Sequence, residues 1–127
     1  MALTNSGCDV LASLLTGASS IHFDNANAEI GVGDSTAAFS AAQTDLQAAA
    51  NKFRKGMDAL YPTTEANVLT FKSTYGPSEA NFAWNEWGVF NAASGGEMLN
   101  RVVEYNGTKL SGQTWFFQVA LTISIGS

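Results

Sequence analysis

Ionisable side chains are scarce in this sequence, and so are cysteine, histidine and proline. Only 13% of the 127 residues are charged, and the chain has one cysteine, one histidine and two prolines. The single cysteine, Cys8, excludes an internal disulfide and a cysteine-rich zinc site. We expect Cys8 to be a small buried residue on an N-terminal helix.

Positive charge is scarcer still, with six lysines and arginines against eleven acidic residues and a net charge of -5. Nucleic acid is therefore excluded as an expected partner, because neutralising phosphates requires clustered basic side chains. No apolar run reaches the length of about 18 residues that a membrane-spanning helix needs, so we expect no membrane partner. Residues 1–17 lack the basic start and apolar core of a signal peptide, which predicts synthesis in the cytoplasm without processing.

The lone histidine, His22, leaves acid–base catalysis without its usual residue, and we expect it to be a surface or hydrogen-bonded side chain. No serine lies in a nucleophile-elbow sequence. Asp24, Asp34 and Asp45 lack the spacing of a calcium loop. The "GVGD" at 31–34 lacks the third glycine of a dinucleotide loop. We therefore expect no catalytic, metal-binding or cofactor-binding residues, no cofactor and no enzyme activity.

Hydrophobic periodicity predicts a short N-terminal helix followed by β-structure. Apolar residues repeat at helical spacing up to Gly17, which stands where a C-terminal cap belongs. Further along, alternation and turn residues predict strands at 21–23, 29–32, 51–60, 68–75, 81–90, around 101 and at 114–125, with one or two helical turns at 43–49. We expect strand 68–75 to pair with the strand that precedes it.

The length suits one domain over 1–127, with the helix in 1–17 and a β domain in 18–127. Six or seven strands with frequent turns predict a mainly β fold, an antiparallel sandwich or a small barrel with a short N-terminal helix.

A predicted hairpin around the turn "NAASGG" at 91–96 sets an acidic residue against a basic one. Pairing across the turn places Glu86 opposite Arg101, within two residues of register. A lone carboxylate on so apolar a strand is costly unless it is paired, and Arg54 is a second possible partner. Our hypothesis is that Glu86 and Arg101 form an internal ion pair that fixes the register of the hairpin.

Aromatic residues are numerous, with three tryptophans, eight phenylalanines and three tyrosines. Trp84 and Trp87 fall on opposite faces of one predicted strand, so we expect at least one face to be covered by another subunit or a second sheet. Self-association into a homo-oligomer follows as an expectation. The candidate interface residues are Trp84, Trp87, Phe90, Trp115, Phe116, Leu11 and Leu14.

Several motifs follow one another in order between residues 28 and 125: "IGVGDSTAAFSAAQTDLQ", "KFRK", "LTFKSTYG", "FAWNEWGVFNAASGGEMLNRVVE" and an alternating terminal strand. This order resembles small virion structural proteins of tailed bacteriophages. It is also similar to the collar domains of phage tail fibres, whose pattern has a Gly-Asp turn, a Thr-x-Leu and a Glu-x-Gly-Leu-Phe before a glycine. The matching elements are Ile30–Asp34, Thr44–Leu46, Arg54, Glu86–Phe90, Leu99 and Arg101.

The resemblance implies a structural protein of a phage particle, located in the virion. A fibre collar continues into a long shaft and this sequence ends at Ser127, so a protein that decorates or cements the capsid is favoured over a fibre. The implied partners are other virion proteins, either the major capsid protein or a tail protein. Two alternatives stay open: a small tail, baseplate or fibre-associated protein, and a carbohydrate- or receptor-binding β-sandwich that stacks sugars on Trp84 or Trp87.

Overall fold

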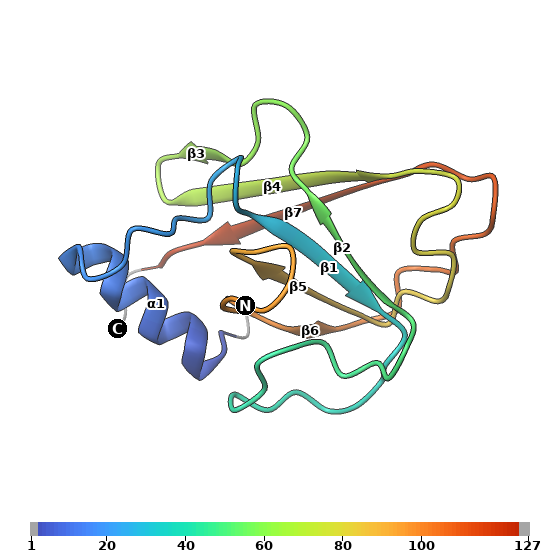
Figure 1. Ribbon diagram of the computed structural model, residues 1–127, viewed down its shortest axis with the longest axis horizontal. Coiled ribbons are helices and arrows are strands. Elements are labelled where there is room, and N and C mark those ends of the chain that lie inside the picture. The colour runs from blue at the N-terminus through green and yellow to red at the C-terminus, as the bar shows by residue number, and fades with distance from the viewer. Residues whose placement is uncertain (1–2, 125–127) are drawn as a thin grey trace.

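The computed structural model describes residues 3–124, which form one helix and seven strands (Figure 1). The elements are α1 (Asn5–Thr16), β1 (Glu29–Gly33), β2 (Lys52–Gly56), β3 (Thr63–Glu65), β4 (Val68–Tyr75), β5 (Glu86–Phe90), β6 (Val102–Val103) and β7 (Trp115–Thr122). One antiparallel sheet has the order β2-β1-β5-β6, and a second has the order β3-β4-β7. The fold is thus mainly β, as predicted, and the two sheets do not close into a barrel over the described residues.

The N-terminal helix begins and ends where its sequence indicates. The Gly7 N–H donates to the Thr4 hydroxyl at 2.8 Å, and Gly17 adopts the left-handed conformation with φ 75°. Gly7 faces inward, so close to Leu99 that an added Cβ would collide with the Leu99 carbonyl. Cys8, the next residue around the helix, is exposed, which corrects the expectation that it would be buried.

The two sheets share one hydrophobic core built around aromatic residues. The Trp84 ring packs edge-to-face on Tyr75, with 4.7 Å between ring centroids, and on Phe117 at 5.5 Å. Tyr75 on β4 also donates its hydroxyl to the Ile30 carbonyl on β1 at 2.8 Å, a link between the sheets. Burial raises the pKa of Tyr75 well above its ordinary value, so the hydroxyl keeps the proton that it donates.

Two predicted elements are absent or shorter in the structure. Residues 21–23 are irregular, and Phe23 contributes to the core by packing rather than by strand pairing. The predicted strand at 51–60 is limited to Lys52–Gly56, because its ladder with β1 ends at the pair Gly56–Glu29, and Leu60 further on has φ 72°. Strand 68–75 has the predicted limits, but it pairs with β3 and β7 and not with β2.

The segment 43–49 is not helical, in contrast to the prediction. The N–H groups of Gln47 and Ala48 donate to the Glu86 carboxylate, at 2.8 and 2.9 Å, in place of carbonyls one helical turn earlier. Residues 34–51 therefore form one long irregular loop between β1 and β2, which runs next to β6 in Figure 1 and contacts Glu86 of β5. A loop of this length within a compact domain is uncommon and is usually functional.

The last two predicted strands are present but shorter. The strand predicted at 81–90 is regular only from Glu86, since Trp84 exchanges backbone hydrogen bonds with Asn106 and Gly107 in an irregular segment. In β7, burial alternates as predicted: Val119 and Leu121 are buried, and every second residue from Phe116 to Thr122 is exposed. Ile123, which the prediction includes in this strand, lies beyond the end of β7 and is 57% exposed, and Ile125 lies outside the described residues. A membrane-spanning helix, with the length and apolar character that it requires, is not found among residues 3–124.

Candidate functional site

The outer face of the four-stranded sheet, which points away from the second sheet, carries a buried charged centre. Cross-strand pairing places Glu86 beside Gly33 and places Gly88 beside Gly31 on this face. The neighbouring residues Trp87 and Val89 point to the opposite face and join the shared core. Every residue of β5 is buried, because the second sheet covers one face and the 34–51 loop covers the other.

Glycines make room for the charged centre. An added Cβ at Gly33 would overlap the Glu86 carboxylate, and one at Gly31 would lie 2.7 Å from the Phe90 ring. The strand sequence "EIGVG" therefore alternates core residues with positions that must stay bare. This spacing allows the loop to approach the sheet closely.

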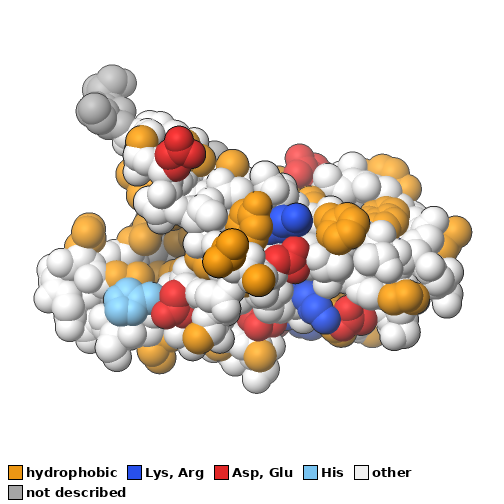
Figure 2. All heavy atoms as spheres, turned by 90° about the horizontal axis from the view of Figure 1, so that it is seen from above, with side chains coloured by type: hydrophobic (Ala, Val, Ile, Leu, Met, Phe, Trp, Pro, Cys, Tyr) orange, Lys and Arg blue, Asp and Glu red, His pale blue; other side chains and the backbone are white. Residues whose placement is uncertain are grey.

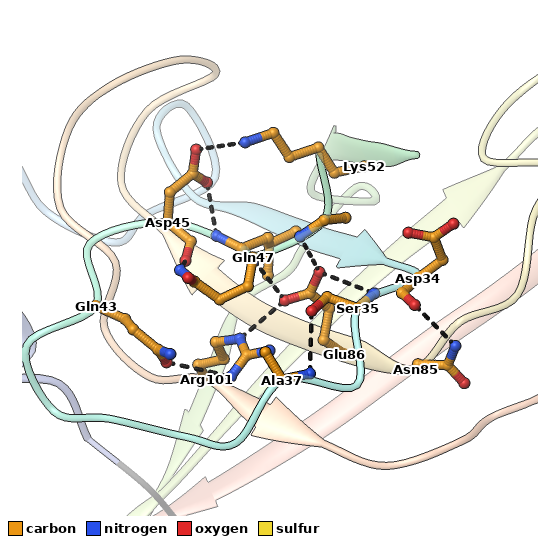
Figure 3. A network of polar contacts seen from close by, with 12 residues as sticks. Asp34, Ser35, Ala37, Gln43, Asp45, Gln47, Lys52, Asn85, Glu86 and Arg101 are labelled. Atoms are coloured by element: carbon orange, nitrogen blue, oxygen red, sulfur yellow. Dashed lines mark hydrogen bonds and ion pairs between the residues drawn. The ribbon is translucent and has the colours of Figure 1, made fainter. Parts of the chain in front are cut away.

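Glu86 ties three parts of the chain together (Figure 3). Its Oε1 accepts from Arg101 Nε and from the Gln47 N–H, each at 2.8 Å. Its Oε2 accepts from the Ala48 N–H at 2.9 Å and from the Ser35 N–H at 3.4 Å. One carboxylate thus holds both ends of the 34–51 loop against β5.

Arg101 completes the centre, and neither member of the ion pair has any exposed side-chain surface. The Arg101 Nη1 donates to Gln43 Oε1 at 3.1 Å, a contact with the middle of the loop. Arg101 Nη2 is buried and has no hydrogen-bond acceptor among the described residues. A buried pair that is not fully satisfied adds little net stability over an apolar replacement, which favours positioning as its role.

The structure brings Glu86 and Arg101 together, with a small shift in register. Glu86 lies opposite Val103 and Trp87 lies opposite Val102, so Arg101 is two residues from the directly opposite position. Residues two apart on a strand share a face, so Arg101 still reaches the carboxylate. Arg54 is not the partner of Glu86: its guanidinium lies 3.5 Å from the centroid of the Phe90 ring.

Arg54 holds the turn between β5 and β6. Its Nη1 donates to the carbonyls of Ala92 and Gly95, each at 2.9 Å, and its Nη2 contacts Asp45 at 3.4 Å. Lys109 has a comparable role at the other end of the fold, where its buried Nζ donates to the Gly76 carbonyl and to Asn81 Oδ1. The inward-pointing cationic side chains of Arg54 and Lys109 therefore hold turns and loops in place through hydrogen bonds.

The residues from 3 to 124 do not gather a metal-binding group of histidine, cysteine, aspartate or glutamate side chains. His22 is exposed at the rim of a cavity of about 200 Å³ between α1 and the three-stranded sheet. That cavity is lined mainly by apolar side chains, including Leu11, Leu14 and Phe71.

Three of the seven candidate interface residues lie inside the protein. Trp84, Trp87 and Phe90 are only 1%, 7% and 0% exposed, which contradicts their assignment to an intermolecular surface. Trp84 and Trp87 do not fall on opposite faces as predicted, because both lie in the core between the two sheets and pack on Phe117. The second sheet, one of the two expected covers, therefore covers both indoles, and the 34–51 loop covers the face that carries Phe90. Trp87 also donates its Nε1 to Glu104 at 2.9 Å.

The remaining candidates differ from one another. Trp115 is partly buried against Trp84, with 5.0 Å between ring centroids. Leu11 packs against the core and Leu14 lines the apolar cavity. Phe116 alone among the candidates is mostly exposed, at 68%.

Sequence reasoning missed most of the exposed apolar surface, which lies in turns and at element ends. Figure 2 shows hydrophobic side chains in small groups between polar and charged ones on one face of the molecule. The large hydrophobic side chains that are more than half exposed are Leu15, Ile21, Leu60, Tyr105, Leu110, Phe116 and Ile123. Helical spacing could have identified Leu15, which adjoins Leu14 at the end of α1, and the alternation of β7 places Phe116 on the outer face. No periodic signal marks Ile21, Leu60, Tyr105 or Leu110.

No protein-family model matches this sequence, and no curated protein or solved structure is significantly similar to it.

Proposed function

We propose that this chain is a non-enzymatic structural protein of a tailed-bacteriophage particle that decorates or cements the capsid through contacts with neighbouring subunits. The order of its sequence motifs supports the phage assignment. The exposed apolar surface supports the mode of action, because binding surfaces between proteins are enriched in aromatic and aliphatic side chains and poor in charge.

The observation that carries the proposal is the contrast between buried charge and exposed apolar groups. Glu86, Arg101 and Lys109 are fully buried and hold loops, while Leu60 and Leu15 are 90% and 88% exposed. Such an arrangement suits a rigid framework that binds other proteins through its surface.

The residues that carry the phage resemblance lie mostly in the framework. Glu86, Arg101 and Leu99 are buried, and Arg54 supports the turn that follows β5. The resemblance therefore concerns a way of building the four-stranded sheet, and it does not distinguish the head of a particle from its tail.

Locating the protein in the particle tests the proposal. Gradient-purified virions from the phage that encodes this chain would be analysed by quantitative mass spectrometry, and cryo-EM maps of wild-type and gene-deleted particles would be subtracted. We expect many copies per particle and difference density on the capsid surface. Density only at the tail or baseplate would replace the capsid role with the alternative, and absence of the protein from the virions would refute both.

The two tryptophans proposed to bind carbohydrate or a receptor are buried. Stacking on a sugar requires an open aromatic face, and Trp84 and Trp87 are enclosed by Tyr75, Trp115 and Phe117. We therefore do not retain this alternative.

A further inference from the structure

The strand β7 occupies an edge of the three-stranded sheet. It pairs along its whole length with β4 and with no other strand. Within residues 3–124, no backbone or side-chain group outside this ladder forms a hydrogen bond with residues 115–122. One side of an eight-residue strand is therefore unpaired.

The register shows which backbone groups face the unpaired side. The Ile123 N–H donates to the carbonyl of Asn67, the residue opposite it in the β4–β7 register, at 2.9 Å. In an antiparallel ladder, such hydrogen-bonded positions alternate with positions that point away from the partner. The N–H and C=O groups that point to the free side therefore belong to Phe116, Gln118, Ala120 and Thr122.

This edge lacks the usual protection against pairing with another strand. Residues 113–124 contain no charged side chain and no proline. The other edges differ: β2 carries three basic residues, β3 has three residues including Glu65, and β6 has two residues. Native edges are normally short, charged or interrupted, and a long uncharged edge is a template for strand addition.

We propose that β7 pairs antiparallel with β7 of a second copy, around a twofold axis at Gln118, and joins two three-stranded sheets into one. A second copy is the favoured occupant because two eight-residue, uncharged strands can pair over their whole length without bringing charges together, and among residues 3–124 the other edge strands are shorter or charged. Isologous contacts of this kind form closed dimers.

The twofold at Gln118 gives a consistent register on both faces. It pairs Phe116 with Ala120 of the second copy, a large side chain beside a small one, on the exposed face. On the inner face it pairs Trp115 with Leu121 and Phe117 with Val119, so apolar residues stay with apolar residues. Phe116, 68% exposed in the monomer, would be partly covered.

The charged group nearest this axis does not oppose the pairing. Lys72 lies on β4 opposite Gln118, and the two copies of Lys72 would be separated by three strand spacings, about 14 Å. That separation exceeds the screening length of about 10 Å at 0.1 M ionic strength. The Lys72 ammonium also lies 5.6 Å from the centroid of Phe116, a cation–π contact that the pairing can retain.

This inference does not depend on the phage assignment, because the pairing would exist in a purified sample of the full chain. Sedimentation velocity over a hundredfold concentration range tests it first, and we expect a reversible dimer. Gln118→Lys brings two like charges directly opposite each other and is expected to weaken the dimer about tenfold or more. Thr70→Lys, on the same outer face but in the central strand β4, is the matched control and is expected to leave dimerisation unchanged.

Cross-linking tests the register independently of any loss of folding. Cα atoms of a hydrogen-bonded antiparallel pair lie about 5.5 Å apart, within the range that a disulfide spans. Gln118→Cys in a Cys8→Ser background should therefore form a disulfide-linked dimer under mild oxidation. Ala93→Cys in the same background, in the turn of the other sheet, should not. A monomer at all concentrations, a dimer insensitive to Gln118→Lys, or equal cross-linking at positions 118 and 93 would each overturn the proposal.

Discussion

Each sheet of this protein contains a strand rich in aromatic residues, β5 in one and β7 in the other, but the surfaces around these two strands differ. In the four-stranded sheet, β5 is buried at all five residues, since a sheet covers one face and the 34–51 loop covers the other. In the three-stranded sheet, burial along β7 alternates, and its outer face and one edge are open. An apolar strand pattern alone therefore does not identify an intermolecular surface.

The difference in coverage arises from the residues on the outer faces of the two sheets. The four-stranded sheet has Gly31, Gly33 and Gly88 there, together with one carboxylate that accepts loop N–H groups. The three-stranded sheet has Phe116 and Gln118 at matching positions, and no described segment forms hydrogen bonds over them. Glycines and a hydrogen-bond acceptor on the outer face of the four-stranded sheet allow the protein's own loop to pack there. Bulky side chains without an acceptor leave the outer face of β7 uncovered.

The largest expected effect compares the same truncation on the two outer faces. Phe90→Ala removes a ring that is fully buried under the loop and stacked on Arg54, and should reduce the free energy of unfolding by about 3–5 kcal/mol. Phe116→Ala should change it by no more than about 0.5 kcal/mol in dilute solution, where the monomer dominates. Urea denaturation of both variants would measure the difference. Equal losses would mean that the two faces are not covered differently.

A second comparison removes one member of an ion pair. Arg101→Met leaves the Glu86 carboxylate buried without its cation, and should cost about 3–5 kcal/mol. Lys52→Met breaks the exposed pair with Asp45 and should cost no more than about 1 kcal/mol. Thermal and chemical unfolding of the two variants provide the measurement. A loss for Arg101→Met as small as that for Lys52→Met would argue against a closed charged centre.

The glycine positions offer a smaller and more local test. Gly33→Ala forces the Glu86 carboxylate to move and should destabilise the fold by about 1–3 kcal/mol. Gly56→Ala is the matched control, because its Cβ would meet only the end of the flexible Glu29 side chain, at 3.2 Å, with an expected change within about 0.5 kcal/mol. Hydrogen exchange should show faster opening of the 34–51 loop for Gly33→Ala only. Unchanged exchange would contradict the close packing of loop and sheet.

The smallest expected effect concerns the dependence of stability on pH in the acidic range. Burial raises the pKa of Asp45, but hydrogen bonds from Lys52 and the Leu46 N–H, together with the positive charges of Lys52 and Arg54, outweigh it and hold the pKa below its ordinary value of 3.8. The carboxylate therefore contributes stability that is complete above that value and is lost as pH falls through the lower, folded-state pKa. Asp45→Asn should make the melting temperature less dependent on pH below about 4. Parallel pH profiles for wild type and variant would contradict this contribution.

The parts of the fold that follow from neighbouring residues were predictable. Thr4 and Gly17 delimit a helix whose apolar residues repeat at helical spacing, and the alternation over 68–75 marks β4 with the correct limits. The meeting of Glu86 and Arg101 was also predictable to within two residues of register, because residues two apart on a strand share a face. Each of these features is encoded within a short stretch of chain.

The features that failed depend on distant segments. The predicted helical turns at 43–49 are replaced by hydrogen bonds to Glu86, which lies 39 residues beyond Gln47. The predicted partner of β4 was the strand at 51–60, yet β4 pairs with β3 and, over eight positions, with β7. The choice of strand partners and the competition for N–H groups are not visible in local periodicity.

The sequence by itself determined the β-rich class, the helix caps, the alternation of β7 and the pairing of one acid with one base, because these depend on residue spacing. Only the tertiary structure decided that Trp84, Trp87 and Phe90 are interior and that the exposed apolar surface is Phe116 with residues of turns and element ends. The physical reason is that burial depends on what covers a face, and here the cover of one sheet is a loop held from a distant strand by a single carboxylate.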